Sequence, residues 1–212
     1  FWTHLLENYE LVVYDQRNHG ENPEAGSFGH SLGGFQEDLS AILAFAGEKW
    51  GEKAPHGLFH SVSGIASLVH ATQNEWPWEK LVLFDPPLVP GREEPLFEKA
   101  FQAERFLANW ALGRPDTFHE PGELGDQLKT VRGMQGWVPG AHELLARSIL
   151  RETPSGWILS CPRELEAAIY LANAHAGLWE RLDRLAGYRD RMLILSADPE
   201  VGDARYLSLI HI

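Results

Sequence analysis

A short apolar run that passes through a serine into a helical pattern constrains this chain more than any other feature. Residues 57–60 read Gly-Leu-Phe-His, Ser61 follows, and residues 62–71 carry apolar side chains at helical spacing. A sharp turn from a strand into a helix holds the side chain at the turn exposed above the sheet. The pattern therefore predicts a nucleophilic Ser61 at the carboxyl end of a buried strand.

A second serine, Ser31, matches the string G-x-S-x-G better than Ser61 does. Residues 29–33 read Gly-His-Ser-Leu-Gly, whereas Phe59 and Ser63 occupy the two glycine positions around Ser61. Loop-forming residues precede Ser31, and a nucleophile of this type must directly follow a strand. The context therefore favours Ser61, and we expect Ser31 to lie in the loop that starts the next helix and to cap it. A nucleophilic Ser31, or a nucleophile at neither serine, remains the alternative.

Strand and helix patterns alternate along the chain. Strands are predicted at residues 11–14, 57–60, 81–84 and 192–196, with a surface helix at 35–50. This alternation favours an α/β fold in which helices cover a parallel sheet. Residues 88–188 show no convincing strand and carry helical patterns at 96–112, 141–150 and 164–185. We interpret them as a helical insertion over the sheet.

Composition excludes several classes of partner. The net charge of -12 disfavours nucleic acid and anionic membranes, which need a basic surface. No apolar run approaches the ~20 residues of a membrane-spanning helix. A single cysteine, Cys161, excludes an internal disulfide and a cysteine-based zinc cage. We expect a soluble, cytoplasmic protein that acts on a small molecule and uses no metal or cofactor.

The order of these motifs resembles the α/β-hydrolase superfamily with a cap domain. Residues 15–20 are similar to the D-x-R-G-H-G turn of that family, with Asn18 in place of a glycine, and residues 60–64 surround the serine. Asp85-Pro86-Pro87 and Ala197-Asp198-Pro199 end two of the predicted strands. The resemblance implies a partial α/β-hydrolase parallel sheet flanked by helices, with a helical cap insertion.

This resemblance divides the chain into four parts. Residues 1–87 form the hydrolase core, 88–188 the cap, and 189–206 the return to the core. Residues 207–212 resemble a translated transposon end used in preparing sequencing libraries, so we expect a non-native tail there. The resemblance also implies that the first strands of the sheet precede Phe1. We therefore expect these 212 residues alone to be unstable and inactive.

The resemblance further implies a serine hydrolase of an ester, lactone or small amide that uses a Ser-His-Asp triad. Ser61 would attack the acyl carbon, and the Val62 N–H would stabilise the oxyanion. The acid in this family usually follows the strand after the cap, which points to Asp198, with Asp85 and Asp203 as alternatives.

Two parts of the machinery are expected outside the chain. Only His211 follows Asp198, and it lies in the tail, so we expect the catalytic histidine beyond the chain end. The second oxyanion donor is expected before residue 1. A non-catalytic small-ligand-binding protein, favoured by Phe59 near the turn, and an acyltransferase remain alternative functions.

Overall fold

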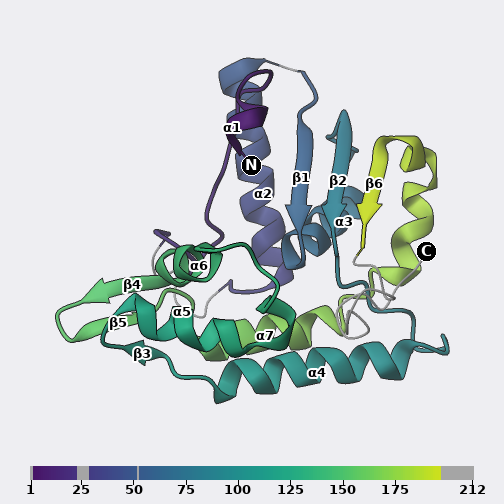
Figure 1. Ribbon diagram of the computed structural model, residues 1–212. Helices are drawn as coiled ribbons and strands as arrows, with labels where there is room; N and C mark the ends of the chain where they lie inside the picture. Colours follow the sequence, from purple (N-terminus) through teal and green to yellow (C-terminus); the bar gives the residue numbers. More distant parts are fainter. Residues whose placement is uncertain (1, 23–28, 52, 197–212) are drawn as a thin grey trace.

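Three parallel strands form the sheet that positions the turn at Ser61. The computed structural model describes residues 2–22, 29–51 and 53–196. The strands are β1 (His56–His60), β2 (Lys80–Phe84) and β6 (Met192–Leu195), in the order β1-β2-β6. The register pairs His60 with Phe84 and Phe84 with Leu195, so the three carboxyl ends lie at one edge of the sheet (Figure 1). The predicted parallel sheet is confirmed.

The main core lies between this sheet and two helices, α2 (Leu32–Trp50) and α3 (Val62–Gln73). Side chains from α2, α3 and β2 are at most 2% exposed in it: Phe35, Leu39, Ile65, Leu68, Leu81 and Leu83. A short helix, α1 (Trp2–Leu5), precedes these elements. Burial of these apolar side chains is what holds α3, and therefore the turn that starts it, against the sheet.

The chain between β2 and β6, residues 85–191, is called the insertion below. Its helices are α4 (Phe97–Gly113), α5 (Pro121–Thr130), α6 (Ala141–Ile149), α7 (Arg163–Asn173) and the 3-10 helices η1 (Arg132–Met134) and η2 (Trp179–Arg191). Helices α4 and α7 pack against each other and lie beyond the carboxyl ends of the strands (Figure 1). The insertion therefore faces the edge of the sheet that carries Ser61.

The insertion also contains strands, so the prediction that residues 88–188 hold none is wrong. Strands β3 (Thr117–Phe118), β5 (Gly156–Leu159) and β4 (Leu150–Thr153) form an antiparallel sheet in the order β3-β5-β4. Residues 154 and 155 are the two-residue loop of a β4–β5 hairpin, between the helical patterns predicted at 141–150 and 164–185. These strands are two to four residues long, too short for an alternating pattern to stand out.

Residues 11–14 do not form the predicted strand. They have no regular secondary structure, no described segment pairs with them, and the Val12 and Val13 side chains are 39% and 69% exposed. A β-branched run becomes a strand only when neighbouring backbone supplies hydrogen bonds and cover.

The single helix predicted over residues 164–185 is also wrong, because α7 ends at Asn173 and η2 begins at Trp179.

Candidate active site

Ser61 lies in a strained turn between β1 and α3, as the sequence predicts. Its backbone angles are φ 53° and ψ -127°, a conformation that costs a non-glycine residue about 1–3 kcal/mol. The Ser61 N–H donates to the Phe84 carbonyl at 3.0 Å, and the Ser61 carbonyl accepts from Gly64 and Ile65 at 2.9 and 3.2 Å. These bonds to β2 and to α3 hold the strained residue in place.

Gly64 allows this turn to pack closely on the loop after β2. A Cβ at Gly64 would lie 3.3 Å from the Pro86 Cβ, which is tighter than ordinary van der Waals contact. The missing side chain therefore lets α3 approach Pro86 while Ser61 stays half-buried.

The Val62 N–H is available as a hydrogen-bond donor next to Ser61. Val62 is the first residue of α3, and the first N–H groups of a helix have no acceptor within the helix. Among the described residues, no backbone carbonyl accepts a hydrogen bond from Val62. The positive end of the helix dipole adds to the attraction of this position for a negative oxygen.

The two residues that depart from the usual string have defined places in the turn. The Ser63 hydroxyl donates to the His60 carbonyl at 2.7 Å and accepts from the His60 N–H at 3.1 Å, so it braces the turn. The Phe59 ring packs edge-on against Trp78, with ring centroids 5.3 Å apart. A Cβ at Gly57 would lie 2.9 Å from the Phe59 ring, so the glycine makes room for it.

Ser31 has the role of a helix cap. Its backbone is extended, with φ -154°, and its hydroxyl accepts from the Gly34 N–H at 3.1 Å at the start of α2. The predicted cap is confirmed. The G-x-S-x-G string here therefore belongs to a loop-to-helix junction.

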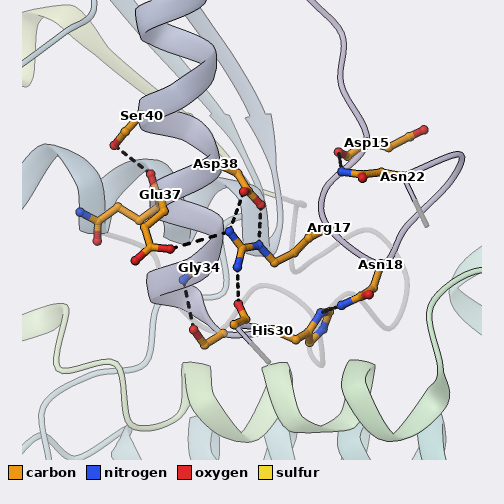
Figure 2. Close-up of polar contacts among 12 residues, drawn as sticks. Asp15, Arg17, Asn18, Asn22, His30, Gly34, Glu37, Asp38 and Ser40 are labelled. Carbon is orange, nitrogen blue, oxygen red and sulfur yellow. Dashed lines mark hydrogen bonds and ion pairs between the residues drawn. The ribbon is translucent and has the colours of Figure 1, made fainter. Parts of the chain in front are cut away.

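Arg17 ties the loop of residues 15–20 to α2 (Figure 2). Its guanidinium donates to both oxygens of Asp38, at 2.7 and 2.6 Å, and to the Gly29 carbonyl at 2.8 Å. Two hydrogen bonds from one guanidinium to one carboxylate fix the orientation of Arg17 as well as its distance from Asp38. The loop is therefore anchored at a helix that also forms the main core.

Asn18 and His30 extend this network. Asn18 is 3% exposed and has φ 63°, a conformation that asparagine tolerates, which explains how it stands where the family motif has glycine. Burial, with His19 and Arg17 nearby, lowers the pKa of His30 to about 4, so its ring is neutral. The His30 Nδ1 lies 2.9 Å from the Asn18 amide nitrogen and accepts from it (Figure 2).

Of the acid candidates, the structure describes Asp85. It follows β2 directly, as Ser61 follows β1, and the register places the two residues at neighbouring strand ends. Asp85 has φ 42°, and its N–H donates to the Leu195 carbonyl at 2.7 Å. Asp198, Asp203 and His211 lie outside the described residues.

No described histidine forms a hydrogen bond with the Ser61 hydroxyl. The ring of His19 bonds to the Arg17 carbonyl at 3.0 Å, and that of His142 to the Met134 carbonyl at 2.8 Å. His175 packs against Phe101 with ring centroids 5.6 Å apart. A complete triad is therefore not present in residues 2–22, 29–51 and 53–196.

A pocket of about 130 Å³ lies between α3 and the insertion. Ile65 contributes from α3, four residues after Ser61 in the sequence. The remaining lining comes from the loop before α4, from Phe97, and from the segment between α7 and η2: Val89, Pro90, Arg92, Phe97, Asn173, Ala174, His175, Ala176, Gly177, Leu178 and Glu180. The lining thus combines apolar side chains with the polar side chains of Arg92, Asn173, His175 and Glu180.

Sequence reasoning missed Asn173, which lines this pocket, and Glu104, which accepts a hydrogen bond from Asn173 at 3.0 Å. Both are 4% exposed. A signal for Glu104 was present, because it falls four residues from Ala100 and from Ala108 on an otherwise apolar helix face.

Within the part of the chain that the structure describes, no three His, Cys, Asp or Glu side chains are grouped as metal ligands, and no helix is long and apolar enough to cross a bilayer.

The fold is shared with several solved hydrolases. An E-2-(acetamidomethylene)succinate hydrolase is 18% identical, with a TM-score of 0.60 over 86% of this chain and 60% of its own. The thioesterase domain from the curacin biosynthetic pathway is 12% identical, with a TM-score of 0.56 over 91% and 75%. The peroxisomal α/β-hydrolase Lpx1 of Saccharomyces cerevisiae is 14% identical, with a TM-score of 0.55 over 85% and 50%.

These similarities show that the chain has the α/β-hydrolase fold, as the motif order predicts. The chain spans 60% of the succinate hydrolase and half of Lpx1. No model of a protein family matches the sequence, and a search of curated proteins finds no relative.

Proposed function

We propose that the protein is a serine hydrolase of a carboxylic ester, lactone or small amide, with Ser61 as its nucleophile. The strained backbone of Ser61 carries this proposal, since a serine is held at φ 53° at the end of a strand, where a glycine would fit without strain. The fold supports it, because the structural neighbours include hydrolases and a thioesterase. This chemistry needs no cofactor.

The proposed reaction has two steps. The Ser61 Oγ bonds to the acyl carbon while a histidine takes its proton, and the Val62 N–H binds the oxyanion of the tetrahedral intermediate. Collapse of this intermediate breaks the bond to the alcohol or amine, which leaves with the proton from the histidine. Water then attacks the acyl-enzyme in the same way, releasing the acid and restoring Ser61.

Asp198 is proposed to orient the histidine, and Asp85 is its competitor. The position of Asp85 at the strand end beside Ser61, with φ 42°, supports the second assignment. The two are separated by comparing Asp198→Asn with Asp85→Asn. In the variant that removes the true triad acid, kcat should fall about 10⁴-fold, because the histidine is then held in the wrong tautomer.

We further propose that residues 88–188 act as a cap on the site. Helices α4 and α7 lie beyond the carboxyl ends of the strands (Figure 1). Residues of this segment and Ile65 of α3 line the pocket. A pocket of this kind would serve a hydrolase, an acyltransferase or a non-catalytic ligand-binding protein equally well.

A fluorophosphonate probe tests the nucleophile. The protein, produced from its complete reading frame, should be labelled at Ser61, and Ser61→Ala should abolish the labelling. Ser31→Ala is the matched control, because Ser31 caps α2 and should not react. Labelling that persists in Ser61→Ala and disappears in Ser31→Ala would reverse the assignment, and no labelling at all would favour the ligand-binding alternative.

A further inference from the structure

The side-chain amide of Asn173 is held in one orientation at the end of α7. Its nitrogen donates to the Pro87 carbonyl at 2.9 Å and to the Glu104 Oε1 at 3.0 Å. A backbone carbonyl can only accept, so the NH₂ group must lie on this side and the oxygen on the other. Both amide hydrogens are therefore used within the protein.

Glu104 strengthens this orientation. It lies on α4 at 4% exposure, and burial raises the pKa of its carboxyl group to about 7. Turning the Asn173 amide over would put its oxygen against the Pro87 carbonyl, which can only accept, and would remove the donor that Glu104 Oε1 accepts from. The Pro87 carbonyl thus keeps the amide from turning.

The Asn173 oxygen remains free to accept a hydrogen bond. No described donor bonds to it, and it is not among the described buried polar atoms that lack a partner, so solvent reaches it. Asn173 is almost entirely buried and lines the pocket beside Ile65, which places the opening to this oxygen at the pocket.

We propose that Asn173 Oδ1 is a recognition site in this pocket for a ligand that carries a hydroxyl or amide N–H donor. The inference rests on the proposed function to the extent that the ligand is taken to be the substrate of Ser61. The substrate is then an ester or amide that carries such a donor.

Asn173 is the buried polar residue of the described pocket lining. Ile65, Val89, Pro90 and Phe97 supply apolar walls, while Arg92, His175 and Glu180 belong to exposed positions. An analogue with a methyl group in place of the donor would bury Oδ1 without a partner. We expect this to weaken binding about tenfold.

The test measures binding in the Ser61→Ala variant, produced from the complete reading frame, so that no ligand is turned over. The probes are methyl esters with a hydroxyl at carbon 2, 3 or 4, each paired with the ester in which methyl replaces hydroxyl. Titrations followed by NMR should show one hydroxy ester binding about tenfold more tightly than its partner. The same ester should shift the Asn173 side-chain amide signals, and its partner should not.

Equal affinity in all three pairs, or no shift at Asn173, would overturn the proposal. Asn173→Leu should remove the preference, and Leu171→Ala, on the exposed face of the same helix and outside the pocket, should keep it. The opposite result in folded proteins also overturns the proposal. If Asn173→Leu does not fold, the amide shift decides. If the Ser61→Ala variant prefers the hydroxy ester but Ser61 of the wild type does not react with the fluorophosphonate, only the proposed hydrolase function is contradicted.

Discussion

At the scale of single residues, Ser61 shows a conflict between stability and function. Its φ of 53° suits glycine, so Ser61→Gly should relieve strain and raise the free energy of unfolding by about 1 kcal/mol. Ser61→Ala keeps the Cβ and should give no such gain. Urea unfolding of the two variants checks this, and equal stabilities would show that the strain is not stored at Ser61.

Two glycines of α2 should respond in opposite directions to alanine. A Cβ at Gly34 would overlap the Gly29 carbonyl oxygen and lie 2.6 Å from the Arg17 guanidinium, so Gly34→Ala should cost about 2 kcal/mol. Gly47 has nothing within 4 Å of such a Cβ, so Gly47→Ala should stabilise the helix by about 1 kcal/mol. Thermal unfolding of both variants measures the contrast, and a loss at Gly47 as large as that at Gly34 would contradict it.

At the scale of elements, the packing of α4 on α7 should depend on pH through Glu104. Burial raises the pKa of Glu104 from 4.5 to about 7, so the folded state favours the protonated acid. The stabilisation that comes from keeping Glu104 protonated is fully present below pH 4.5. It is lost as the pH rises through 7, and the free energy of unfolding falls by about 3 kcal/mol. Nearby Tyr170 stays neutral in this range, because burial raises its pKa.

Glu104→Gln should remove this dependence. The glutamine oxygen can still accept from Asn173, and no proton is bound or released there. Unfolding by denaturant at pH 5, 6 and 7 should therefore show the variant gaining stability relative to the wild type as the pH rises. A constant difference between the two proteins across this range would exclude the predicted ionisation.

The sequence predicts well those elements whose structure is determined by residues close together in the chain. The turn at Ser61 and the cap at Ser31 depend on neighbours in sequence, and both are found. The strand at 11–14 fails because pairing depends on another segment, and β3 to β5 were missed because antiparallel pairing makes strands of very short runs. Asn173 and Glu104 escaped notice because their contacts join residues 69 positions apart.

At the scale of the whole molecule, the main core and the insertion contribute different things to one edge of the sheet. The core fixes Ser61 and Asp85 at neighbouring strand ends. The insertion brings Asn173 to the Pro87 carbonyl, just where the chain leaves β2. The proposed site is thus built where the insertion meets the carboxyl ends of the strands, and the crevice at that end of an α/β sheet is a common position for small-molecule sites.

Residues 117–159 of the insertion have an apolar core of their own, so they should open separately from the main core, which Leu88, Ile169, Leu178 and Leu185 of the insertion help to form. Phe118, Leu124, Leu128, Ala146, Leu150 and Leu159 form a small core within the insertion, distinct from the one around Ile65 and Leu81. Leu128→Ala should destabilise the small core by about 3 kcal/mol and speed amide exchange in β4 and β5 roughly hundredfold. Amides of β1 and β2 should be unaffected.

Leu81→Ala is the matched control, because Leu81 is fully buried in the main core. It should speed exchange in β1 and β2, and hydrogen exchange followed by mass spectrometry resolves the two sets of strands. Equal acceleration of all these strands by Leu128→Ala would mean that the chain opens as one unit, because a single cooperative unit exposes every amide together. Separate opening would instead allow residues 117–159 to unfold while the sheet that holds Ser61 stays folded.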